Sequence, residues 1–277
     1  MSLPGAAPSR ARYAGRGRYG SQTLHAEWTK LRTLASTGWL LFAVAVLTIA
    51  VSAAADASAT CQSRGCQTDP AKLSLTGVQA AQAIVAIVAV LAVSNEYSSG
   101  MIQVTLAAVP RRLTVLAAKA ALIGGLFLAA GAVTVLASVL AGRLILPGHG
   151  FTPAHGYQPL SLGDGPVLRA ACGSVLYLVL IALLSLGVAS AVRESAVAIG
   201  LVLGLMYVLP VVASVVSNQQ WHRHLEQIGP ITAGLYIQDT VDVPSLPLTP
   251  WQGLGVLALW AAGALTVGAL VLRLRDA

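Results

Sequence analysis

Residues 94–112 read SNEYSSGMIQVTLAAVPRR and form a polar, charged interruption between two long apolar runs. The runs before it (75–93) and after it (113–140) are each long enough to cross a hydrocarbon core of about 30 Å at about 1.5 Å per residue. The interruption is therefore expected at a membrane surface. It contains a Ser-Ser-Gly break at 98–100, an apolar helical segment at 101–109 and a final Pro-Arg-Arg. This composition predicts a short surface helix that is offered to a partner.

The composition of the chain is that of a polytopic membrane protein. Of its 277 residues, 56% are hydrophobic and 10% are charged, whereas ordinary soluble domains have about 25% charged residues. The net charge of +7 comes from basic residues that lie next to apolar runs. Membrane topology and anionic headgroups explain such a pattern better than nucleic acid does. We expect contacts with membrane lipid and no nucleic-acid partner.

The apolar runs predict an all-α membrane protein with six transmembrane helices, at about 38–55, 75–93, 114–140, 167–192, 196–216 and 251–272. Only Arg193-Glu194-Ser195 separates the fourth and fifth spans, and the combined run is too long for one helix, so a tight turn is predicted there. Residues 1–20 are rich in Gly, Ala, Pro, Ser and Arg and are expected to be a disordered basic tail. Residues 21–277 then form a single transmembrane domain.

The positions of Lys and Arg orient these spans. Twelve of them fall on the face that holds both termini and the 94–112 loop, and five fall on the opposite face. Because positive residues stay inside, both termini and this loop are predicted to be cytoplasmic. Cys61 and Cys66 then share an outer loop, where a local disulfide and two free thiols are both open interpretations.

Three further predictions concern smaller features. Cys172 lies in an apolar run and is expected to be a small core residue. Gly200 and Gly204 form a GxxxG pattern, which is expected to pack within the bundle. The semi-apolar segment 228–237 is too short and too interrupted to cross the membrane, so it is expected to be a re-entrant or interfacial helix in the outer leaflet.

An amphipathic stretch, 21–36, precedes the first span. Its apolar residues fall at positions i, i+4 and i+7, which predicts a helix lying in the membrane interface. A simple cytoplasmic extension of the first span is the alternative. The residues expected to form the interfacial helix are Leu24, Glu27, Trp28, Lys30, Leu31 and Arg32.

Motifs of catalysis are absent from the sequence, which has no Walker A loop, zinc-protease helix, GxSxG elbow or dinucleotide fingerprint. We therefore expect a protein that is not an enzyme and that binds no metal or cofactor itself. Asp56 and Arg169 lie at the ends of spans, and Lys119 lies near the cytoplasmic end of the third. Proton-coupled pumps usually need intramembrane ionisable relays, so proton coupling is not expected and the energy for transport is expected to come from elsewhere. Ion-coupled transport that uses backbone carbonyls stays an alternative.

Three segments resemble permease subunits of ABC type 2 exporters, in the form common in high-GC actinobacteria: HAEWTKLRTLASTGWLL (25–41), NEYSSGMIQVTLAAVPRRLTVLAAK (95–119) and LRLRDA (272–277). The resemblance runs through six spans and most of the length. The loop is its most specific part, because the family places an acidic residue, a glycine and a Pro-Arg step before a lysine-bearing third span. The matching residues here are Glu96, Gly100, Pro110, Arg111 or Arg112, and Lys119.

The resemblance implies a multi-pass permease of the bacterial plasma membrane that forms a translocation pathway and pairs with itself or a homologue. Two separately encoded ATPase subunits would bind ATP and Mg²⁺, and segments 21–32 and 94–112 would contact them. A stand-alone carrier or a membrane anchor not driven by ATP is the alternative. The residues expected to couple the chain to the ATPase are Glu96, Tyr97, Gly100, Met101, Leu106, Pro110, Arg111 and Arg112.

Overall fold

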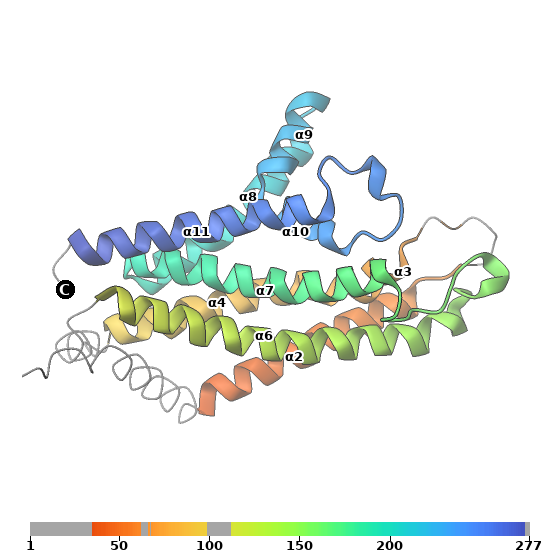
Figure 1. Ribbon diagram of the computed structural model, residues 1–277, viewed down its shortest axis with the longest axis horizontal. Helices are drawn as coiled ribbons and strands as arrows, with labels where there is room; N and C mark the ends of the chain where they lie inside the picture. Colours follow the sequence, from red (N-terminus) through yellow and green to blue (C-terminus); the bar gives the residue numbers. More distant parts are fainter. Residues whose placement is uncertain (1–34, 62–65, 67, 99–111, 275–277) are drawn as a thin grey trace, which may run out of the picture.

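The chain folds as a helical bundle in the computed structural model, which describes residues 35–61, 66, 68–98 and 112–274 (Figure 1). All regular secondary structure in these ranges is helical. In the described part of the chain, six helices are long and apolar enough to cross a membrane, which confirms the predicted all-α membrane fold with six transmembrane helices. They are α2 (Ala35–Ser58), α4 (Thr76–Ser98), α6 (Arg112–Ile145), α7 (Gly165–Val192), α8 (Ser195–Val215) and α11 (Pro250–Leu274).

The described chain begins and ends at the same end of the bundle (Figure 1). The last residue of α4, Ser98, and the first residue of α6, Arg112, lie at this end too. We call it the terminal end, and we call the opposite end, which contains a disulfide between Cys61 and Cys66, the disulfide end. Because the described chain begins and ends at the same end of the bundle, its helices cross the bundle an even number of times.

Helix α7 lies at the centre of the bundle, between α6 and α11 in Figure 1. Helices α7 and α4 are the most buried spans, whereas most residues of α2, α8 and α11 are not buried within the bundle. Small residues bring α7 and α11 close together, since a Cβ added to Gly187 would lie 2.5 Å from the Ala264 carbonyl carbon. Close backbone approach at small residues is the usual way in which membrane helices associate.

The turn between α7 and α8 confirms the prediction of two separate spans. Arg193 has a φ of 63°, in the left-handed region, and so ends α7 at Val192. The next residue, Glu194, caps α8 by accepting hydrogen bonds from the backbone N–H groups of Ala196 (3.0 Å) and Val197 (2.6 Å). A side-chain acceptor at this position satisfies N–H groups that the first helical turn leaves unpaired.

The segment between α8 and α11 forms α9 (Gln219–Ile228), α10 (Pro230–Leu235) and a 3₁₀ turn, η3 (Tyr236–Gln238). Helix α9 projects away from the bundle, whereas α10 lies beside α11 (Figure 1). Ile237 is fully buried, and a Cβ added to Gly173 of α7 would lie 2.0 Å from its Cγ1 atom. Helix α10 and η3 are therefore packed against α7 and α11, and the re-entrant and interfacial interpretations of 228–237 both stay predictions.

Two predictions about small residues are wrong. Cys172 is exposed on α7 rather than placed in the core, because apolarity alone does not tell a lipid-facing position from a buried one. Gly200 and Gly204 of α8 do not pack within the bundle, since a Cβ added to either would meet no atom within 4 Å. The buried face of α8 is instead formed by Ala198, Val202, Met206 and Ala213.

Candidate functional site

The predicted coupling loop is described only at its two ends. Helix α4 continues to Ser98 rather than ending at 93, so the backbone of Glu96 and Tyr97 belongs to its last turn, and Arg112 is the first residue of α6. The candidate span ends at Asn95, within two residues of the predicted end at about 93, and backbone hydrogen bonding carries the helix beyond that apolar run. The other coupling residues lie outside the described ranges, as do all those of the interfacial helix: Gly100, Met101, Leu106, Pro110 and Arg111, and Leu24, Glu27, Trp28, Lys30, Leu31 and Arg32.

A polar cluster joins three spans inside the bundle. The Tyr177 hydroxyl of α7 donates a hydrogen bond to Oε1 of Gln82 in α4, and Nε2 of Gln82 lies 3.5 Å from the Tyr207 hydroxyl of α8. Tyr177 and Gln82 are buried, whereas Tyr207 is 42% exposed. A buried amide or phenol is costly unless it is hydrogen-bonded. The cluster therefore favours one arrangement of α4, α7 and α8.

The residues of this cluster were not singled out from the sequence. Gln82 is the signal that could have found it, since a carboxamide interrupts an otherwise apolar run at 75–93. A second buried pair lies nearer the disulfide end, where Nε2 of Gln238 donates a hydrogen bond to the Ser174 hydroxyl at 3.0 Å. Both pairs fix neighbouring elements by hydrogen bonds that contain no ionised group.

Charged groups in the spans lie toward the two ends of the bundle. Asp56, in the last turn of α2, is fully buried at the disulfide end. Its Oδ1 atom accepts a hydrogen bond from the Ser74 hydroxyl at 3.0 Å. Lys119, in the second turn of α6, is buried near the terminal end. In the described part of the spans, no series of ionisable residues connects these two ends.

Asp69 organises the loops at the disulfide end. Its carboxylate caps α3 (Pro70–Ser74) by accepting from the N–H groups of Ala71 and Lys72. It also accepts from the hydroxyl of Thr240 (2.7 Å), from its N–H group (2.5 Å) and from the N–H group of Val241 (3.0 Å). The Asp69 side chain therefore links the loop between α2 and α4 to the segment before α11.

The disulfide joins Cys61 to Cys66, so the bridged alternative is the one that the structure contains. The Tyr157 hydroxyl donates a hydrogen bond to the Cys66 carbonyl, and the Cys61 N–H group donates to the His149 carbonyl at 2.9 Å. Gly150, with a φ of 93°, allows this approach, since a Cβ on it would lie 2.0 Å from the Cys61 carbonyl oxygen. The loop that follows α6 is thereby attached to the disulfide.

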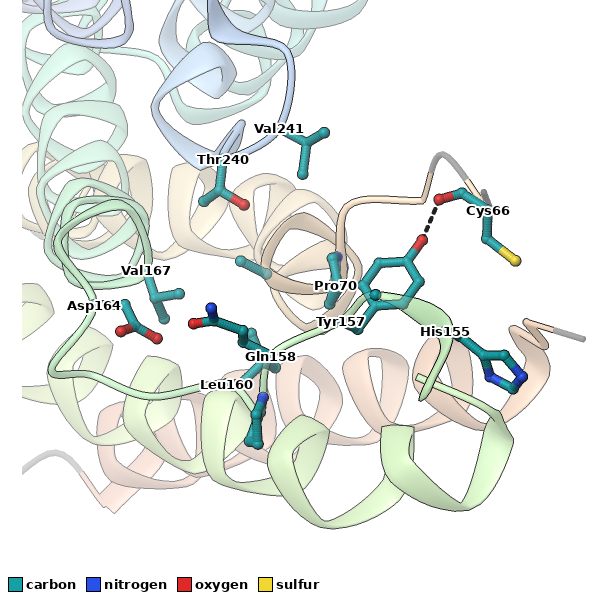
Figure 2. A pocket seen from close by; sticks show the side chains of 13 residues that line it. Cys66, Pro70, His155, Tyr157, Gln158, Leu160, Asp164, Val167, Thr240 and Val241 are labelled. Atoms are coloured by element: carbon teal, nitrogen blue, oxygen red, sulfur yellow. Dashed lines mark hydrogen bonds between the residues drawn. The ribbon is translucent and has the colours of Figure 1, made fainter. Parts of the chain in front are cut away.

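A cavity of about 400 Å³ lies beside these loops (Figure 2). Its lining includes Gln158, Asp164 and Thr240, but the Thr240 hydroxyl is already bonded to Asp69. His155 also lines it, and Nδ1 of His155 lies 2.7 Å from the Gly150 carbonyl oxygen. Within the described ranges no three His, Cys, Asp or Glu side chains are grouped so that they could hold a metal ion.

No protein-family model matches the chain, and no curated protein matches it.

Proposed function

We propose that the chain is the membrane-spanning permease subunit of an ABC exporter of the bacterial plasma membrane. The observation that carries the proposal is the position of the charged groups. Asp56 and Lys119 are buried toward opposite ends of the bundle, and polar contacts in the middle of the spans, such as Tyr177 with Gln82, are uncharged. A transporter with no intramembrane proton relay needs another source of energy. ATP hydrolysis by a separate subunit supplies it.

The ATPase would bind at the terminal end. Three features favour this end: the described chain begins and ends there, α4 ends and α6 begins there, and the sequence assigns most basic residues to this side. The segment 94–112 would dock in a groove of the ATPase and transmit its movement to α4 and α6. ATP and Mg²⁺ would bind to that partner and not to this chain.

The permease would act as a dimer with a second copy or a homologue. Gly200 and Gly204 lie on a face of α8 that no other part of the described chain covers within 4 Å. Val208 and Val211, also on α8, are 57% and 61% exposed. A GxxxG pattern allows two membrane helices to approach closely. This face of α8 therefore supports pairing between permeases.

Purification of the tagged chain from membranes of its native host tests the proposal. We expect an ATP-binding subunit to co-purify, to be identified by mass spectrometry, and to hydrolyse ATP in the complex. A chain that purifies without any ATP-binding protein, and whose cargo accumulates in ATP-free vesicles when an ion gradient is applied, would instead be a stand-alone carrier.

A further inference from the structure

A long apolar groove of about 780 Å³ runs between α7, α8 and α11. On the α7 side it is lined from Leu184 to Val192, the last two turns of that helix, and on the α8 side by Leu201 and Leu205. These positions place it in the half of the bundle nearest the terminal end. Leu201 is 53% exposed. The groove is therefore open to the surrounding membrane.

The groove has the depth of one leaflet. Its α11 side extends from Val256 to Val267, which is about 17 Å at about 1.5 Å per residue. Half of a hydrocarbon core of about 30 Å is about 15 Å. Gln227 and Ile228, at the end of α9, line the groove where it ends near the middle of the bundle. A partner helix that crosses the whole membrane would meet this obstruction, whereas a lipid chain of one leaflet would not.

The side-chain hydrogen-bond donors of the groove are already bonded to the protein. Nε1 of Trp260 donates to the Ile228 carbonyl at 2.9 Å, and Nε2 of Gln227 donates to the Pro247 carbonyl at 3.2 Å. The Thr266 hydroxyl donates to the Gly263 carbonyl at 2.7 Å. Because these donors are used internally, the walls favour an occupant that forms no hydrogen bonds. A hydrocarbon chain meets this condition.

The mouth of the groove at the terminal end is basic. Arg193 directly follows Val192 of the groove wall, and its Nη2 atom lies 3.5 Å from the Val271 carbonyl oxygen of α11. Its side chain thus reaches from α7 toward α11 across the mouth. Arg273 is exposed in the last turn of α11, while the carboxylate of Glu194 is bonded to the first N–H groups of α8. This mouth therefore favours an anionic headgroup.

We propose that the groove binds one acyl chain of an anionic phospholipid from the leaflet at the terminal end, with the headgroup phosphate beside Arg193. The bound chain fills the space that separates α8 from α11. The site is distinct from the open glycine face of α8, because Gly200 and Gly204 do not line the groove.

Trp260 reports on the occupant, because it lines the groove. The full chain with Trp260 as its single tryptophan is reconstituted in phosphatidylcholine nanodiscs that contain increasing amounts of phosphatidylglycerol brominated on its acyl chains. Quenching of Trp260 is expected to saturate at a low fraction of the brominated lipid. A matched chain that keeps only Trp39, which is 71% exposed on α2, reports on bulk lipid and should be quenched in proportion to that fraction.

Two pairs of variants test the site itself. Gly263→Phe fills the groove, whereas Gly255→Phe adds the same side chain to open space on α11 outside it. Only the first should abolish the saturable quenching. Arg193→Gln should weaken the preference for phosphatidylglycerol over phosphatidylcholine by about fivefold, as expected for one basic residue at a membrane surface, and Arg193→Lys should retain it.

Equal, proportional quenching of Trp260 and Trp39 would overturn the proposal, because it would show bulk lipid only. Protection of Trp260 from quenching at every lipid fraction would also overturn it, because a second protein chain would then cover the groove. Neither result depends on ATP or on transport, so the test is independent of the proposed ABC function.

Discussion

Nζ of Lys72 lies 2.6 Å from Oδ1 of Asp239, a residue 167 positions further along the chain. The pair joins α3 to the segment that follows η3. The Arg169 guanidinium of α7 donates a hydrogen bond to the backbone carbonyl of the same Asp239. Together with the bonds of Asp69 to Thr240, these contacts join α3 and α7 to the segment before α11 at the disulfide end of the bundle.

Asp69→Ala is expected to destabilise the fold by about 2 to 4 kcal/mol. It removes the cap of α3, a loss of about 0.5 to 2 kcal/mol, and it leaves the N–H groups of Thr240 and Val241 without this acceptor, at about 1 to 3 kcal/mol. Thermal unfolding of the full chain in detergent, followed by tryptophan fluorescence, measures the loss. Asp164→Ala is the comparison, at about 1 kcal/mol or less, because the Asp164 side chain makes no capping hydrogen bond to α7. Equal losses of stability in the two variants would contradict the role of Asp69 as the side chain that links these loops.

Gly77→Ala is expected to disrupt the contact between α2 and α4. A Cβ at this position would lie 1.9 Å from the Thr48 carbonyl oxygen and 2.7 Å from Oγ of Ser52, and backbone atoms cannot move aside without separating the helices. Overpacking of this kind costs about 1 to 3 kcal/mol or more. Gly125→Ala is the matched control, since its Cβ would meet nothing within 4 Å. The yield of monodisperse protein in size-exclusion chromatography should fall for the first variant alone.

Tyr177→Phe and Gln82→Leu are expected to have non-additive effects on stability. Each single variant leaves the other member of the pair buried without this hydrogen bond, which lowers stability by about 1 to 3 kcal/mol. The double variant removes both members of the bond. A double-mutant cycle on thermal unfolding should give a coupling energy of about 0.5 to 3 kcal/mol. Additive effects would mean that the hydrogen bond contributes nothing to the position of α7 against α4.

The spans could be predicted from the sequence because the length of an apolar run is a local property. The ends of α7 and α8, for example, fall within a few residues of the predicted positions, and Arg193-Glu194 marks the turn between them. The end of α4 at Ser98 could not be predicted in this way, because hydropathy changes at the membrane surface while helical hydrogen bonding continues. Hydrophobicity thus locates a crossing better than it locates the end of a helix.

The polar contacts depend on positions far apart in the sequence. Gln82 and Tyr177 are separated by 95 residues, and nothing in either local segment identifies the other as its partner. The same limit explains the error at Gly200 and Gly204, since a small-residue pattern allows close packing but does not say which helix packs there. The coupling residues Glu96 and Gly100 came from a resemblance, and their roles stay predictions.

Cysteine labelling should show that the disulfide end faces outward. In a Cys172→Ser background, which removes the free thiol, a membrane-impermeant maleimide applied to intact cells should label Ser245→Cys but not Ser98→Cys. The expectation follows from the positions of Lys and Arg in the sequence, of which twelve belong to the side of the terminal end and five to the side of the disulfide end. Labelling of both positions after the cells are opened is the control. Labelling of Ser98→Cys in intact cells would reverse the orientation.

Glu96→Ala and Gly100→Val are expected to abolish transport and to weaken binding of the ATPase while leaving membrane insertion near normal. Contacts with lipid alone would need only the cations Arg111 and Arg112, and an anionic leaflet would repel the carboxylate of Glu96. A loop that docks in a protein groove, in contrast, needs charges that find partners. Loss of one partner of a partly desolvated charge pair at an interface costs about 2 to 5 kcal/mol. Co-purification of the ATPase with each variant measures the effect.

Glu194→Ala is the control for this last prediction, because Glu194 is also acidic and also lies at the terminal end, but its carboxylate caps α8 within the chain. Its loss should lower stability by about 0.5 to 2 kcal/mol without releasing the ATPase. If the 94–112 segment docks as proposed, Glu96→Ala will weaken binding of the ATPase and leave the fold near normal. Glu194→Ala will lower the stability of the fold and leave the ATPase bound. Export at the unmodified rate by both loop variants, with the ATPase still bound, would show that the segment is only a connection between α4 and α6.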